Sequence, residues 1–218
     1  RGKNSMSGLL VKEFSVLKRY GRQYVILFIF FAAFSFYLKS PTYMQSMLTM
    51  VLAMLTFTGM TYDHMAGWDK YVLTMPVDRK TVVLSKYITT LLWAVIALVV
   101  GGVSGVALSQ VPAVKGEGLP EILAVSAALF CMALFIYGIM LPLIFKFGVE
   151  RARSFMFIVI LIPVAAVIGL SKIIPEQMIH SFLNNYALFL IIGIAVFCIA
   201  LYMISYVISV KIYAKKEF

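Results

Sequence analysis

Residues able to carry out chemistry are concentrated in one polar stretch, residues 63–86. This stretch holds three of the nine acidic residues and one of the two histidines. No cysteine or second histidine lies near His64, so no set of metal ligands with zinc-type spacing is present. The Gly-Lys-Ser/Thr sequence of a Walker phosphate loop never occurs. We find no nucleophile–base pair either, which makes an enzyme the least favoured class.

The composition indicates that this polar stretch belongs to a membrane protein. Of the 218 residues, 62% are apolar and 13% are charged, and the mean hydropathy is +0.98. Soluble domains average about 45–50% apolar and about 25% charged residues. This excludes an ordinary soluble enzyme, a disordered regulator and a secreted disulfide scaffold.

Long gaps between charged residues predict six membrane-spanning helices, because a span needs about 20 helical residues. The first gap is short, but Arg22 and Lys39 can extend it by snorkelling. We predict an all-α polytopic membrane protein in which residues 6–218 form a single transmembrane domain. Residues 1–5, before Met6, are interpreted as a cloning remnant. The predicted spans are about 23–38, 42–62, 87–109, 122–145, 154–171 and 187–210.

The positive charges predict the orientation of these spans. Of the 19 Lys and Arg residues, 16 lie in residues 1–22, 63–86, 146–153 and after 210, on one predicted side. The other three are Lys39, Lys115 and Lys172. The positive-inside rule then predicts a multi-pass protein with both termini in the cytoplasm. The net charge of +10 is explained by topology and attraction to membrane lipid, and no nucleic-acid partner is expected.

Residues 7–21 show the spacing of an amphipathic helix. Leu9, Leu10, Phe14, Leu17 and Tyr20 recur every three to four residues. Such a helix can lie in the cytoplasmic interface of the bilayer, with a bend at Gly21 before the first span. The alternative is that it only extends the first span.

Within residues 63–86, a short amphipathic helix is predicted before a second helix that leads into the third span. Met65, Trp68, Val72 and Met75 share one helical face, and Pro76 ends that helix. Asp78 is expected to cap the next helix. Trp68 has two interpretations, an anchor in the membrane interface or part of an apolar face for a soluble partner.

The predicted spans contain no Asp, Glu, Lys, Arg or His. Proton-driven transporters usually bury such residues at the coupling site, so their absence argues against a proton relay. It does not exclude sodium coordinated by backbone carbonyls. If transport is active, its energy must come from another subunit.

Two inner loops resemble those of small ABC-2 type permeases. One is the stretch from Gly67-Trp68 through Pro76, Arg79-Lys80 and Ser85-Lys86-Tyr87, and the other is residues 146–153. The resemblance implies a permease that forms a dimer with itself or a paralogue and docks a cytoplasmic ABC ATPase. It implies no cofactor on this chain, with ATP and Mg on the ATPase.

The resemblance also implies a coupling helix after the second span, at about residues 63–75, that contacts the ATPase. The candidate coupling residues are Asp63, His64, Met65, Gly67, Trp68, Asp69, Lys70, Val72, Pro76, Asp78, Arg79, Lys80, Glu150 and Arg151.

The second span carries a stripe at helical spacing that could line a translocation pathway. It consists of Tyr43, Met47, Met50, Met54, Thr58 and Thr61. Methionine is flexible and suits varied apolar ligands, although the same residues could fill gaps between helices or face lipid. In the third span, Gly101-x-x-x-Gly105 is expected to allow close helix packing.

The finer resemblance is to bacterial exporters of phenol-soluble modulins and other antimicrobial peptides. It implies a non-catalytic exporter subunit in the bacterial plasma membrane, with amphipathic peptides as substrates. The alternative class is an ATP-independent membrane protein, either a channel or an immunity or scaffold protein.

Overall fold

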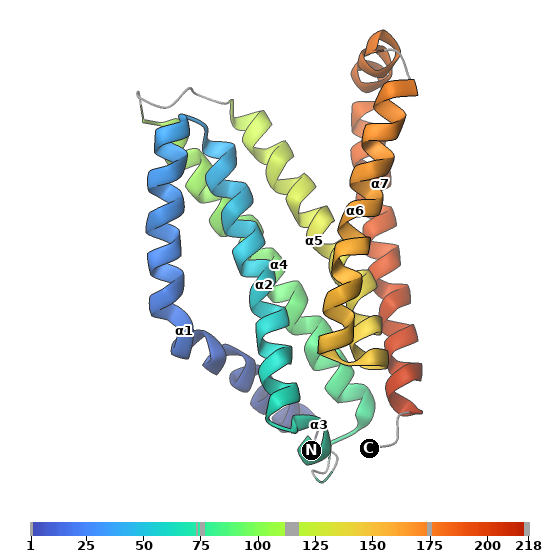
Figure 1. Cartoon of the computed structure of the whole chain (residues 1–218). Coiled ribbons are helices and arrows are strands. Elements are labelled where there is room, and N and C mark those ends of the chain that lie inside the picture. Colours follow the sequence, from blue (N-terminus) through green and yellow to red (C-terminus); the bar gives the residue numbers. More distant parts are fainter. Residues whose placement is uncertain (1, 73, 75–76, 112–117, 174–175, 216–218) are drawn as a thin grey trace. The chain divides into compact units, whose positions relative to one another are not determined.

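The computed structural model describes the chain except for residues 1, 73, 75–76, 112–117, 174–175 and 216–218 (Figure 1). In the described residues every regular element is a helix, which confirms the all-α prediction. The helices are α1 (Gly2–Leu38), α2 (Pro41–Met65), α3 (Trp68–Val72), α4 (Arg79–Ser109), α5 (Leu119–Phe147), α6 (Val149–Ile173) and α7 (Glu176–Ala214).

Among the residues that the structure describes, four segments are long and apolar enough to cross a membrane. They are Pro41–Met65, Arg79–Ser109, Leu119–Phe147 and Phe189–Ala214. The first predicted span corresponds to a shorter apolar segment, Val25–Leu38. The span predicted at 154–171 lies in α6, where the side chains of several residues are outside the described part of the chain. The described residues therefore contain several candidate spans, while the number six stays a prediction.

The amphipathic stretch 7–21 and the first span form one uninterrupted helix, α1. Figure 1 shows that the N-terminal part of α1 runs at an angle to the remainder. At its other end a tight turn, Lys39-Ser40, leads into α2. Lys39 has a φ of 55°, and the Ser35 hydroxyl donates to the Ser40 carbonyl oxygen at 2.6 Å. Pro41 opens α2, where its missing N–H has no helical partner to lose.

The chain divides into two compact units. Unit 1 comprises Arg1–Ala133 and Ala214–Phe218, and unit 2 comprises Leu134–Tyr213. In unit 1, α2 packs against α4 along most of its length. Their buried apolar side chains include Met44, Leu48 and Leu55 on α2, and Val83, Tyr87, Trp93, Ala94 and Ala97 on α4.

Two glycines allow α4 to approach α2 closely, which confirms the packing predicted for Gly101-x-x-x-Gly105. A Cβ atom on Gly101 would lie 3.3 Å from Thr49 Oγ1 and 3.4 Å from Gln45 Cγ. A Cβ atom on Gly105 would lie 3.1 Å from Ile122 Cγ2 of α5. The notch between these glycines is therefore filled by α2 side chains on one side and by α5 on the other.

Gln45 ties α2 to the first half of α5. Its side chain is 1% exposed, and its Nε2 donates to the Ile122 carbonyl oxygen at 3.1 Å and contacts Ser126 Oγ. The Ser126 hydroxyl also donates to the Ile122 carbonyl oxygen, at 2.9 Å. Inside an apolar bundle a polar group must find such partners within the protein, because no water is available to it.

Unit 2 contains the second half of α5, α6 and nearly all of α7. Gly148, with a φ of 83°, makes the one-residue turn from α5 to α6, a conformation that glycine adopts at little cost. Tyr137, Met140 and Leu141 on α5 are almost fully buried, as are Ser209 and Tyr213 on α7. The rings of Phe145 and Tyr213 pack edge to face with centroids 5.5 Å apart.

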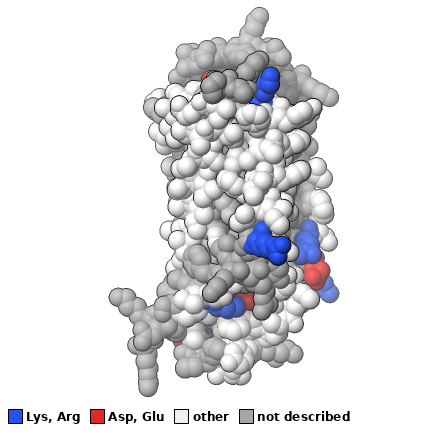
Figure 2. All heavy atoms as spheres, turned by 90° about the vertical axis from the view of Figure 1, so that its left-hand side faces the viewer, with Lys and Arg blue, Asp and Glu red and all other residues white. Residues whose placement is uncertain are grey.

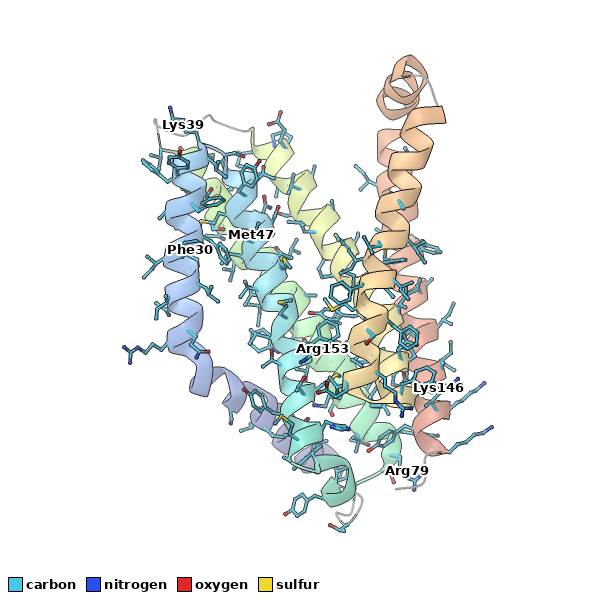
Figure 3. All side chains as sticks on the ribbon, viewed as in Figure 1. Phe30, Lys39, Met47, Arg79, Lys146 and Arg153 are labelled. Carbon is cyan, nitrogen blue, oxygen red and sulfur yellow. The ribbon has the colours of Figure 1, made fainter. Side chains whose placement is uncertain are left out.

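Charged side chains gather toward the ends of the apolar segments. Figure 2 shows a broad region without described charges between Lys and Arg side chains near the top and in the lower half of the molecule. Lys39 lies at one end of unit 1 (Figure 3). We call this the Lys39 end, and the opposite end, where α2 finishes, the Asp63 end.

The Gly105 notch gives a prediction about stability. Gly105→Val should destabilise unit 1, because overpacking a tight interface typically costs about 1–3 kcal/mol. We expect a fall of several degrees in the melting temperature of the detergent-solubilised protein. Gly193→Val is the control, since no atom lies within 4 Å of a Cβ built on Gly193. Equal melting temperatures for the two variants would contradict the packing described.

Candidate functional site

A sharp turn at the Asp63 end separates α2 from α3. Ala66 ends α2 with its N–H donating to the Tyr62 carbonyl oxygen at 2.9 Å. Gly67 follows with a φ of +64°, a left-handed conformation that costs other residues roughly 1–2 kcal/mol. Asp63, His64 and Met65 therefore belong to the last turn of α2, and the predicted coupling helix at about 63–75 is shortened to Trp68–Val72.

Asp63 is the centre of an ion-pair cluster made by three helices. Its Oδ2 lies 2.5 Å from Lys86 Nζ of α4, and its Oδ1 contacts Lys12 Nζ of α1. The side chains of Asp63 and Lys86 are only 13% and 10% exposed, and that of Lys12 is 27% exposed. Ion pairs with so little solvent are screened less by salt than surface pairs.

Trp68 joins α3 to the same cluster. Lys12 Nζ lies 3.8 Å from the centroid of the Trp68 ring, the geometry of a cation–π interaction. The Tyr71 ring lies next to Trp68, with centroids 5.7 Å apart. Asp63, Lys12, Lys86 and Trp68 together are called the Asp63 cluster below.

The apolar face predicted for this region is divided between the interior and the surface. Val72 is 0% exposed and Trp68 is half-buried. By contrast Met65 is 75% exposed and Tyr71 57% exposed, so Tyr71, not Trp68, is the exposed aromatic of α3. The sequence missed this division because the turn at Gly67 rotates α3 away from the helical phase of α2.

The remaining coupling candidates on this loop lie around the start of α4. Asp78 is at the N-cap position, but its side chain makes no capping hydrogen bond, so that part of the prediction is wrong. Its carbonyl oxygen accepts instead from the N–H groups of Thr81 and Val82. Arg79 Nη1 donates to the Ala214 carbonyl oxygen at 2.8 Å, and Lys80 is exposed. The side chains of Asp69 and Lys70, and all of Met75 and Pro76, lie outside the described residues.

Glu150 and Arg151 belong to unit 2, in the first turn of α6, and both side chains are exposed. The Glu150 carboxylate suits this position, because acidic groups are stabilised at the positive end of the helix dipole.

The predicted pathway stripe lies along one side of α2. Tyr43, Met50 and Met54 are 47%, 56% and 45% exposed, and Met47, labelled in Figure 3, is half-buried. The other two members of the stripe are half-buried threonines whose hydroxyls donate to carbonyl oxygens of α2 itself. These bonds run from Thr58 to Met54 at 3.0 Å and from Thr61 to Phe57 at 2.8 Å. The stripe thus presents thioethers and one phenol, while its two threonine hydroxyls already donate to backbone carbonyl oxygens.

Sequence reasoning missed the partners that hold this site together. The amphipathic pattern of residues 7–21 assigns no role to Lys12, and Lys86 enters only as part of a loop motif. Their ends meet at Asp63 because α1, α2 and α4 pack together, a tertiary effect that no local spacing reveals. An acidic residue at the end of an apolar gap was the one available signal.

The fold and these sites define a helical, multi-pass membrane protein. A family model described as ABC-2 family transporter protein matches residues 8–214. The chain therefore belongs to the ABC-2 transporter family, as the two inner loops indicated, and is an ABC-2 type permease. Neither the curated proteins nor the solved structures that were compared contain a match. The family is the membrane component of transporters and implies association with an ABC ATPase.

The turn at Gly67 gives a second prediction. Gly67→Val should lower the melting temperature more than Gly67→Ala, and Gly67→Asn should lower it least, because asparagine tolerates a positive φ best among these residues. No atom lies within 4 Å of a Cβ at Gly67, so side-chain size alone has no effect there. Gly8→Val, also with nothing within 4 Å, is the control. An order at Gly67 that follows side-chain volume, or a loss in Gly8→Val as large as that in Gly67→Val, would contradict the conformational explanation.

Proposed function

We propose that this chain is the permease subunit of an ABC exporter in a bacterial plasma membrane. It forms a dimer and couples to a separate ATPase that binds ATP and Mg²⁺. The observation that carries the proposal is the family match over residues 8–214. The positive charges on the Asp63 side favour an orientation with this end and both termini in the cytoplasm.

The Asp63 end offers a surface suited to an ATPase. α3 lies directly after a segment apolar enough to span the membrane, and it exposes Tyr71 beside Met65. His64, Asp78 and Lys80 are also exposed in unit 1. An apolar and aromatic centre with a polar rim is the usual anatomy of a protein interface.

A charge introduced at the centre of this surface should weaken ATPase binding. We expect Tyr71→Asp to reduce the amount of ATPase that co-purifies with the permease from native membranes at least fivefold, since central aromatic residues often contribute more than about 1 kcal/mol. ATP hydrolysis by the purified complex should fall in parallel. Tyr37→Asp is the matched control, because Tyr37 is 80% exposed at the Lys39 end. If both variants retain the same amount of ATPase, the assignment of this surface to coupling is wrong. If no ATPase co-purifies with the wild-type chain, the proposed function is wrong.

The pathway stripe supports amphipathic or antimicrobial peptides as substrates. Its methionines offer polarizable, adaptable contacts to varied apolar side chains. Tyr43 adds a hydroxyl to an otherwise apolar surface. Sugars would need a dense set of hydrogen-bonding groups, which this stripe lacks.

Truncating methionine side chains of the pathway stripe should therefore weaken the stimulation of ATP hydrolysis by peptide. In the purified complex, we expect amphipathic peptides to stimulate ATP hydrolysis and sugars to have no effect. The double variant Met50→Ala/Met54→Ala should require several-fold more peptide for half-maximal stimulation, because truncating a methionine removes apolar contact area. Met132→Ala, on α5 and 49% exposed, is the control. If the double variant and the wild type need the same peptide concentration for half-maximal stimulation, the stripe does not line the pathway.

A further inference from the structure

The described residues that flank α3 on both sides leave the helical conformation. On one side α3 is joined to α2 through Ala66 and Gly67, whose backbone is outside the helical conformation at Gly67. On the other side, Val77 and Asp78 are non-helical before α4 begins at Arg79. A five-residue helix between two such connections needs side-chain contacts to hold its direction.

The described residues show two such contacts on α3. Val72 is fully buried in unit 1, and Trp68 stacks under the ammonium group of Lys12. The burial of Val72 holds one end of the helix. The contact with Lys12 holds the other end and comes from the amphipathic part of α1, which is far away in the sequence.

Lys12 is itself held by Asp63, because its Nζ contacts Asp63 Oδ1 as well as the Trp68 ring. Asp63 in turn holds Lys86 of α4 at 2.5 Å. Lys12 is therefore the group that connects α3 to an ion pair joining the two packed spans, α2 and α4. A lysine can do this because its point charge attracts a carboxylate and an aromatic face at the same time.

We infer that Lys12 is a positioning residue for coupling. Through Asp63 and Trp68 it fastens α3 to α1, α2 and α4, so that a displacement of α3 moves the spans instead of being absorbed at Gly67 and residues 77–78. This inference rests on the proposed function, in which an ATPase acts on α3. Lys12 takes no part in binding the ATPase, because its side chain is turned toward Asp63 and Trp68.

The first test measures the position of α3 without any ATPase. In the purified permease, amide hydrogen exchange of residues 68–72 should become about 5–30-fold faster in Lys12→Met, the effect of losing roughly one to two kcal/mol of cation–π and ion-pair interaction. Lys12→Arg, which retains the charge and stacks on tryptophan, should stay near the wild type. Arg22→Met removes an exposed positive charge from the same helix and should also leave exchange unchanged. Equal exchange in Lys12→Met and the wild type would overturn the inference.

The second test separates coupling from docking. With the ATPase present, Lys12→Met should co-purify with as much ATPase as the wild type, but peptide stimulation of ATP hydrolysis should fall at least fivefold. Stimulation that stays at the wild-type level, or falls equally in Arg22→Met, would refute the positioning role. If no ATPase binds the wild-type permease, the proposed function fails, while the exchange measurement still decides whether Lys12 holds α3.

A further variant keeps the inference testable if Lys12→Met does not fold. Trp68→Leu leaves the pair between Lys12 and Asp63 in place and removes only the aromatic face. It should accelerate exchange in α3 and reduce stimulation as Lys12→Met does. Trp68→Phe should restore most of both, because phenylalanine also attracts a cation, and a failure of Phe to do better than Leu would count against the cation–π link.

Discussion

Antiparallel packing of α2 against α4 is the interaction on which the rest of unit 1 depends. The two helices meet at Gln45 and Gly101–Gly105 near the Lys39 end, and at Asp63 and Lys86 at the other end. Eighteen residues separate Gln45 from Asp63, and 15 to 19 separate Lys86 from the glycine pair, about 27 Å of helix at 1.5 Å per residue. Both contacts therefore belong to one register, and a shift of one turn would break the notch and the ion pair together.

Several buried polar side chains in the apolar segments of unit 1 hydrogen-bond within their own helix or to α5. Gln45 donates to α5, and Thr49, Thr89 and Ser104 donate to carbonyl oxygens of their own helices. Such hydrogen bonds lower the free-energy cost of burying polar atoms in an apolar environment. The exposed side chains of the pathway stripe on α2 are Tyr43, Met50 and Met54.

Local patterns in the sequence predicted the elements and one close approach between helices, but not the contacts of the site. Charge-free gaps marked the apolar helices, and Gly101 and Gly105 marked the close approach. The site was different. Whether Trp68 faces solvent depends on the φ of Gly67 and on a lysine more than fifty residues earlier in the chain. Asp78 was recognised as the helix start, but its side chain leaves the capping role to backbone groups alone.

The distribution of charge explains why, in the proposed function, coupling of the ATPase to transport should depend on how the helices are held relative to one another. The spans predicted from the sequence contain no Asp, Glu, Lys, Arg or His, which argues against a proton relay within them. Movement is transmitted only by parts that are fixed to one another. In unit 1 the Asp63 cluster joins α1, α2, α3 and α4 at one end, while the glycine notch joins α2, α4 and α5 further along. In unit 1, α3 and α5 are thus connected through contacts at two places on the same pair of helices, α2 and α4.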